Sequence, residues 1–148
     1  MAGSRDSLVV DADTGPVIRG LPRSGPQPVR VQAQRGRDSQ YFVVLRRGDG
    51  NAFQNQFQLM DRPSGQCLTV VRNQDVNGSV VSKAPCKWAA NQVWSFEGRK
   101  GTAAYNLRLL SSGKCLDAHT PPPMTEPAAG TWLQQWDCNG RKNQAWAV

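Results

Sequence analysis

The chain has 148 residues, of which 39% are hydrophobic, and its formal net charge is +7. This length suits one domain, and no apolar run approaches the roughly 20 residues that a membrane-spanning helix needs. The charge is spread along the sequence, without a run of five basic residues or a nucleic-acid-binding motif. We therefore expect neither nucleic acid nor an inserted membrane as a partner.

Four cysteines bear on the compartment in which the protein works. They lie at positions 67, 86, 115 and 138 and form no Cys-x-x-Cys motif. With a single histidine, His119, the chain offers few zinc ligands, so we expect no metal and no cofactor. Two disulfides and four buried free thiols are the alternatives, and disulfides would indicate an oxidising, extracellular setting. The opening residues, MAGSRDSLVV, contain no apolar stretch of the signal-peptide kind.

Three stretches of the chain share one pattern, in which a Thr-Gly or Ser-Gly turn precedes x-Cys-Leu or x-Val-Ile. They are VVDADTGPVIRG from Val9, LMDRPSGQCLTV from Leu59 and LRLLSSGKCLDA from Leu107. After the second and third stretches come another cysteine and then Asn-Gln-x-Trp. In the first stretch Val17 stands at the position of the first cysteine, and further along the chain Gln34 stands at that of the second. The pattern predicts repeats at residues 5–54, 55–102 and 103–148, the first of them degenerate.

Short β-favouring runs recur within each repeat, between Gly, Pro, Asn and Asp residues. Examples are YFVVL, GSVVSK, YNLRLL and TWLQQWDC. No helical stripe of useful length occurs. Units of about 50 residues cannot each bury a core alone, so the repeats must pack around a common axis. We expect Trp94, Trp146 and Phe42 to fill the shared interior.

The frame Cys-Leu-(Asp)…Cys…Asn-Gln-x-Trp resembles the ricin B-chain-like (R-type) lectins and the related carbohydrate-binding modules of bacterial glycoside hydrolases. The resemblance covers nearly the whole chain and is strongest in the second and third repeats. It implies an all-β fold, a single β-trefoil domain over residues 1–148 with three pseudo-symmetric repeats of about four strands each. Within this frame we expect disulfides Cys67–Cys86 and Cys115–Cys138, and none in the first repeat.

The resemblance also implies a sugar site in the third repeat. The residues at the galactose-binding positions of the R-type lectins are Asp117, Gln134, Trp136, Asn143 and Gln144. A carboxylate accepts bonds from two hydroxyls, an amide donates and accepts, and an indole can stack on the apolar face of a sugar ring. His119 is a further candidate contact, although a lone loop histidine is as a rule only solvated. Asn143 and Gln144 are ambiguous, because Asn91 and Gln92 recur in the second repeat without the other site residues.

A strand register follows if each disulfide joins directly opposite residues of two antiparallel strands. On that assumption Asp117 faces Trp136, and His119 faces Gln134. A carboxylate, an indole and an amide would then converge beside one disulfide.

The same assumption leaves the other repeats without a site. In the second repeat Thr69 would face Ala84, and Ser82 takes the position of Gln134. In the first repeat Arg19 would face Gln32. Neither repeat then offers a carboxylate with a stacking ring, so we expect one site per chain.

These patterns favour a lectin-like module that binds a galactose-, N-acetylgalactosamine-, arabinose- or xylan-type glycan and targets a secreted enzyme or toxin. The alternative is a protein-interaction module, a toxin subunit or a protease-inhibitor-like trefoil, whose sugar sites have decayed. We expect no enzyme, because Gly-x-Ser-x-Gly, His-Glu-x-x-His and phosphate-loop motifs do not occur. Asp117 and Asp137, the one nearby carboxylate pair, would lie on opposite strand faces.

Overall fold

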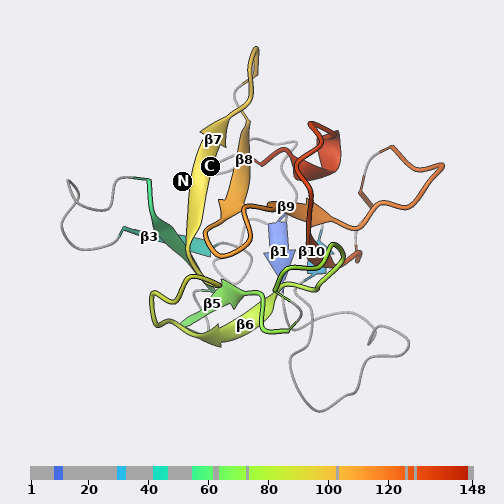
Figure 1. Cartoon of the computed structure of the whole chain (residues 1–148). Coiled ribbons are helices and arrows are strands. Elements are labelled where there is room, and N and C mark those ends of the chain that lie inside the picture. The colour runs from blue at the N-terminus through green and yellow to red at the C-terminus, as the bar shows by residue number, and fades with distance from the viewer. Residues whose placement is uncertain are drawn as a thin grey trace.

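The computed structural model of the chain is built from strands and irregular segments (Figure 1). It describes residues 9–11, 30–32, 42–46, 55–61, 64–72, 74–102, 104–125, 127–128 and 130–146. The predicted all-β class is confirmed. Within these ranges no helix is long and apolar enough to cross a membrane.

Ten strands and one short 3-10 helix, η2, lie in the described ranges. In chain order they are β1 (Val9–Asp11), β2 (Arg30–Gln32), β3 (Phe42–Arg46), β4 (Phe57–Asp61), β5 (Gln66–Thr69), β6 (Ser82–Pro85), β7 (Trp94–Gly98), β8 (Tyr105–Leu109), β9 (Cys115–Ala118), β10 (Leu133–Trp136) and η2 (Lys142–Gln144).

Eight of these strands form one continuous antiparallel sheet. Seven follow the order β10-β9-β8-β7-β4-β5-β6, and β3 pairs with β4. Strands β1 and β2 pair separately. The order brings the start of the second and of the third repeat next to its end, because β4 pairs with β7 at Phe57 and Trp94, and Tyr105 of β8 pairs with Trp146.

Two disulfides join the strands within the second and third repeats. They are Cys67–Cys86 and Cys115–Cys138, and the described part of the chain holds no free cysteine. The predicted pairing is confirmed, and the alternative of free thiols is wrong. Each crosslink closes a loop of 19 or 23 residues and is expected to contribute about 3 kcal/mol by restricting the unfolded chain.

The predicted register is wrong by two residues. In the third repeat Asp117 faces Gln134, not Trp136, which lies opposite Cys115. His119 lies beside Trp132, to whose carbonyl its backbone N–H donates, rather than opposite Gln134.

The second repeat shows the same shift of two. Thr69 faces Ser82, and Ala84 lies opposite Cys67. In the first repeat Gln32 pairs with Val9, and Arg19 lies outside the described residues.

The cause of the shift is that the second cysteine of each pair lies beyond a strand rather than within it. Strand β10 ends at Trp136, and the chain then brings the Cα of Cys138 to 5.1 Å from that of Cys115. A disulfide needs only this separation and not a direct cross-strand pair. Because the error is an even number of residues, every side chain keeps its predicted face.

The core gathers apolar side chains from the second and third repeats. Its buried members are Leu59, Leu68, Val70, Val81, Trp94, Leu107, Leu109, Leu116, Ala118 and Leu133. Trp94 is fully buried, as predicted, and its indole N–H donates to the carbonyl of Leu68 at 3.3 Å. Trp146 is partly buried and packs against this cluster. The side chain of Phe42 lies outside the described part of the structure.

We predict that Trp94→Ala lowers the free energy of unfolding by roughly 3–5 kcal/mol, because it empties a buried site of indole size. Urea unfolding followed by circular dichroism measures the loss. Trp136→Ala is the matched control, since its indole is 40% exposed, and it should cost less than about 1 kcal/mol. Equal losses in the two variants would contradict the division between core and surface tryptophans.

Candidate functional site

The antiparallel pair formed by β9 and β10, extended by His119 and Trp132, has two unlike faces. Leu116, Ala118 and Leu133 enter the core from one face. Successive strand residues alternate between faces, so the residues between them share the other side. This side, called the outer face below, carries Cys115, Asp117 and His119 on one strand line and Trp132, Gln134 and Trp136 on the other.

Asp117 lies at the middle of the outer face and is only 2% exposed. Its neighbour across the strands, Gln134, donates from Nε2 to Asp117 Oδ1 at 2.9 Å. Gln144 donates from its own Nε2 to Asp117 Oδ2 at 2.9 Å. An ionised carboxylate has about four acceptor positions, so a carboxylate holding these two bonds can accept further hydrogen bonds.

The electrostatics of Asp117 follow from this burial. Burial raises the pKa of the Asp117 carboxyl above the ordinary value of 3.8. The hydrogen bonds from Gln144 and Gln134 act in the opposite direction and only partly offset the burial. The ionised carboxylate is therefore under-solvated and gains from any additional donor.

Gln144 has a structural task besides holding Asp117. It is fully buried, its Oε1 accepts from the backbone N–H of Asn139 at 2.9 Å, and its Nε2 also donates to the carbonyl of Asp137 at 3.0 Å. Asn143 donates from Nδ2 to the carbonyl of Ala118 at 3.0 Å. The two amides thus tie η2 to the turn after β10 and to the end of β9.

The second repeat makes the same amide contacts. Gln92 Oε1 accepts from the backbone N–H of Lys87 at 2.7 Å, and Gln92 Nε2 donates to Thr69 Oγ1 at 3.1 Å. Asn91 donates from Nδ2 to the carbonyl of Val70 at 3.0 Å. The Asn-Gln pair therefore has a structural role in both repeats, and what differs is a hydroxyl in one where the other has a carboxylate.

Two other positions of the second repeat also lack the polar or aromatic group that the third repeat has. Ser82, opposite Thr69, is buried, and its hydroxyl has no hydrogen-bond partner among the described residues. Ala84 stands where the third repeat has Trp136, since each is paired with the first cysteine of its repeat. The second repeat thus keeps the frame without the carboxylate, the amide and the ring.

Trp136 ends β10 with its indole 40% exposed. Its Cζ3 lies 3.6 Å from the place that a Cβ on Gly78 would take. Gly78 has a φ of +91°, which favours glycine, and its backbone N–H donates to the carbonyl of Gln135 at 2.9 Å. The turn around Gly78, from the second repeat, therefore supports the indole of the third.

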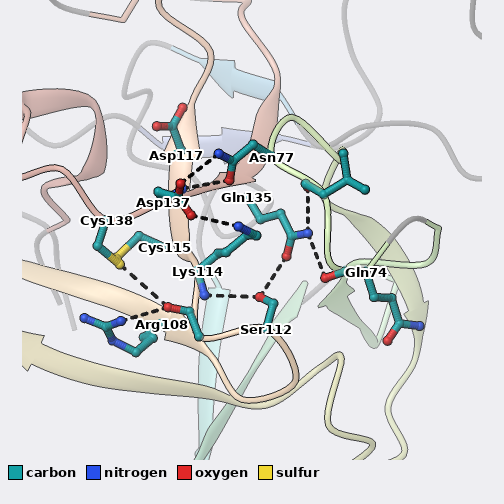
Figure 2. Close-up of polar contacts among 12 residues, drawn as sticks. Gln74, Asn77, Arg108, Ser112, Lys114, Cys115, Asp117, Gln135, Asp137 and Cys138 are labelled. Carbon is teal, nitrogen blue, oxygen red and sulfur yellow. Dashed lines mark hydrogen bonds and ion pairs between the residues drawn. A yellow bond between two sulfur atoms is a disulfide. The ribbon is translucent and has the colours of Figure 1, made fainter.

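Two sets of polar contacts hold that turn in place (Figure 2). Asn77 Nδ2 donates to Asp137 Oδ2, and the Asp137 backbone N–H donates to Asn77 Oδ1, both at 3.0 Å. Lys114 Nζ lies 2.8 Å from Asp137 Oδ1. The hydrogen bond from Lys114, followed by that from Asn77, lowers the pKa of the Asp137 carboxyl.

Gln135 supplies the second set. From the core side of β10 its Nε2 donates to the carbonyls of Gln74 and Val76, each at 2.9 Å. Its Oε1 accepts from Ser112 Oγ at 3.0 Å. Asn77 and Gln135 were not among the predicted site residues. The repeat pattern gives no sign of them, because their contacts join two repeats. Asn77 of the second repeat contacts Asp137 of the third, and Gln135 of the third repeat contacts the turn in the second.

His119 and Trp132 form a stacked pair at the other end of the outer face. Their ring centroids are 4.0 Å apart and their planes are inclined by 11°. Trp132 was also missed, although its spacing of two residues from Gln134 places it on the same strand face.

The structure therefore brings the six predicted residues together on and around one strand pair, β9 and β10. Asp117, Gln134 and Gln144 are directly hydrogen-bonded, and Trp136 flanks them on the same face. Asn143 contacts the strand backbone, and His119 lies two residues beyond Asp117. In the described ranges no three His, Cys, Asp or Glu side chains gather to hold a metal ion. Hydrogen bonding to hydroxyls and ring stacking are the chemistry that this arrangement offers.

Comparison with known structures concerns the fold. A designed 3-fold symmetric protein, ThreeFoil, is 24% identical, has a TM-score of 0.70 and is matched over 95% of both chains. An exo-β-1,3-galactanase from Clostridium thermocellum is 20% identical with a TM-score of 0.66, and the match covers 95% of this chain and 29% of the galactanase. These similarities confirm the predicted β-trefoil.

A third similar structure is the Polyporus squamosus lectin bound to the epitope Neu5Acα2-6Galβ1-4GlcNAc. It is 9% identical with a TM-score of 0.65, and the match covers 94% of this chain and 46% of that one. The chain thus spans less than half of both the lectin and the galactanase.

Sequence comparison identifies the family. A search of curated proteins found no matching sequence. The family model for the ricin-type beta-trefoil lectin domain matches residues 55–148, which is more than half of the chain. The protein therefore belongs to the family of ricin-type β-trefoil lectin domains.

Proposed function

We propose that this domain binds a galactose-type or related sugar at one site, on the outer face of β9 and β10. The observation that carries the proposal is the buried Asp117 carboxylate, oriented by two glutamine amides beside the exposed indole of Trp136. In Figure 2 the Asp117 side chain points away from the contacts around Asp137.

Sugar chemistry suits this arrangement. Two neighbouring sugar hydroxyls can donate to one carboxylate, and they would supply the hydrogen bonds that burial denies to Asp117. The apolar C–H face of the same ring would lie on Trp136, while Gln134 and Asn143 offer amide groups to other hydroxyls. The lectin similar to this chain is bound to a galactose-containing epitope, and the other similar structure is a galactanase, so galactose-type ligands come first for testing. N-acetylgalactosamine, arabinose and xylan ligands follow as related candidates.

A binding role is favoured over catalysis. A glycosidase needs a carboxylic acid that stays protonated near neutral pH, facing a second carboxylate. Asp137, which directly follows β10, has its side chain held by Lys114 and Asn77, and in Figure 2 the Asp117 side chain points away from these contacts. The two carboxylates therefore do not face one another as a glycosidase pair must.

The proposal takes residues 1–148 as one domain of three repeats that is attached to, or assembles with, a larger secreted enzyme or toxin. A single shallow site should bind a monosaccharide with a dissociation constant of about 0.1–1 mM, which is useful mainly when tethering raises the effective concentration. The small share of the galactanase that the chain spans, 29%, supports attachment. The two disulfides support an extracellular location.

A second candidate function is protein recognition by a trefoil whose sugar sites have decayed. It is favoured by the second repeat, where Thr69, Ser82 and Ala84 replace the carboxylate, amide and ring. A lectin would bind sugar at the third repeat, whereas a trefoil with decayed sites would not. A sugar titration therefore distinguishes the two candidates.

We predict that galactose or lactose changes the tryptophan fluorescence of the protein and that Trp136→Ala abolishes binding. Calorimetry should give a stoichiometry of one per chain. Trp88→Ala is the control, because it removes a partly exposed indole of the second repeat and should leave the affinity unchanged. Two or three sugars per chain would contradict a single site, and undiminished binding by Trp136→Ala would move the site elsewhere.

We predict that Asp117→Asn abolishes sugar binding without lowering the melting temperature at pH 7. The pKa of Asp117 is raised in the folded protein, so the folded state holds more protons than the unfolded one between pH 3.8 and that raised value. Through this window the contribution of Asp117 to stability falls as pH rises, and an asparagine removes that loss. The oxygen of the introduced asparagine can still accept from Gln144 Nε2. The Gln134 amide would rotate by half a turn, so that its oxygen accepts from the nitrogen of the introduced asparagine.

The sugar affinity of the wild-type protein should fall on acidification through the same pH window, because a protonated carboxyl accepts fewer hydrogen bonds.

The control for this pH experiment is Glu97→Gln. The hydrogen bond from Asn106, followed by that from Arg108, lowers the pKa of Glu97 below 4.5, so its contribution to stability is lost as pH falls. This variant should therefore shift stability with the opposite pH dependence and bind sugar normally. Thermal unfolding from pH 3.5 to 7, with sugar titration at each pH, measures both. A marked loss of stability at pH 7 in Asp117→Asn would instead assign the carboxylate to the fold.

A further inference from the structure

The outer face carries a second aromatic group, the stacked pair of His119 and Trp132, that the proposed single-sugar site does not use. The pair spans the two strands, since the His119 backbone N–H donates to the Trp132 carbonyl at 3.0 Å. Both side chains are partly exposed. A partly exposed indole beside a polar binding site is the kind of group on which a sugar ring packs.

The spacing of the aromatic groups suits a ligand longer than one ring. Trp132, Gln134 and Trp136 alternate along one strand, and at about 3.3 Å per residue the two tryptophans are about 13 Å apart along it. Asp117 faces Gln134 and therefore lies midway between them. A pyranose ring placed on Asp117 and Trp136 would leave the opposite end of the face free for its neighbour.

The stacking contact also limits the conformations of the two rings, so less side-chain freedom would be lost on binding. The parallel contact with His119 restricts the Trp132 ring. Residues 120–131 form the connecting segment between the two strand lines. At its base, Thr131 Oγ1 donates to the His119 carbonyl at 2.6 Å, and Thr120 Oγ1 donates to the Ala118 carbonyl at 2.7 Å. A preorganised ring binds with a smaller entropic loss than a mobile one.

The connecting segment itself does not fold back over the pair in the described part of the structure. Residues 121–125 are exposed, and the segment, orange in Figure 1, projects from the body of the molecule. Residues 121–125 therefore leave the stacked pair open to a ligand.

We propose that Trp132 and His119 form a second sugar subsite, which binds the next pyranose ring of an oligosaccharide whose neighbouring ring lies on Asp117 and Trp136. The inference rests on the proposed function and specifies its ligand as at least a disaccharide. Trp132 provides the stacking surface, and His119 positions it.

Calorimetric titrations with matched mono- and disaccharides test the subsite, using galactose with β1,3-linked galactobiose and xylose with xylobiose. For the wild type we expect one disaccharide to bind about 5- to 10-fold more tightly than its monosaccharide, as one further aromatic contact would give. Trp132→Ala should reduce the disaccharide affinity to that of the monosaccharide and leave the monosaccharide affinity unchanged. Trp136→Ala should abolish both.

Two further variants keep the test decisive. Trp132→Leu retains apolar bulk at the base of the connecting segment without a ring, and it replaces Trp132→Ala if that variant does not fold. Trp132→Phe retains a ring and should keep most of the disaccharide preference. Thermal unfolding verifies that each variant is folded.

The possible outcomes separate this inference from the proposed function. If the wild type binds none of these sugars, the proposed function fails and the subsite with it. If it binds monosaccharides but prefers no disaccharide, the function stands and the subsite is wrong. The subsite is equally wrong if the Trp132 variants weaken mono- and disaccharide alike, because the pair then only supports the primary site, or if they change neither affinity.

Discussion

The buried glutamine of Asn-Gln-x-Trp is the constraint on which the second and third repeats depend. Gln144 accepts one backbone bond and donates to a backbone carbonyl and a side chain, and Gln92 does the same in the second repeat. A buried amide left unpaired costs about 1–3 kcal/mol, so the turn after the second cysteine has to adopt the conformation that supplies these partners. That turn brings the cysteine within disulfide reach, and the tryptophan two residues on then meets the core.

The proposed sugar site is a small addition to this frame. The glutamine donates to the Thr69 hydroxyl in one repeat and to the Asp117 carboxylate in the other. The carboxylate is costly, because burial raises its pKa and disfavours the charge that ligand binding would use. Loss of stability at a position that serves binding is a common exchange in proteins. It offers a physical reason why a repeat that binds no ligand would replace the carboxylate and keep the glutamine of Asn-Gln-x-Trp.

The proposed site in the third repeat is completed by residues of the second repeat. The turn of residues 74–79 lies against Trp136 and is held by Gln135 from the core side and by the contacts between Asn77 and Asp137 from the other. Trp136 is exposed and would otherwise have several rotamers, so this neighbour limits its freedom. The position of the stacking ring is thus a property of the packed trefoil and not of one repeat.

The sequence by itself determined what depends on spacing along the chain: the frame shared by the second and third repeats, the cysteine pairs, the burial of Trp94 and the face shared by Asp117, Gln134 and Trp136. Strand periodicity is local, and a face survives an error of two residues in register. Tertiary structure alone decided that Asp117 faces Gln134, that His119 stacks on Trp132 and that Asn77 holds Asp137. These contacts depend on where a strand ends relative to its disulfide and on how one repeat packs against the next. Both result from the balance of the whole core, and no short stretch of sequence encodes them.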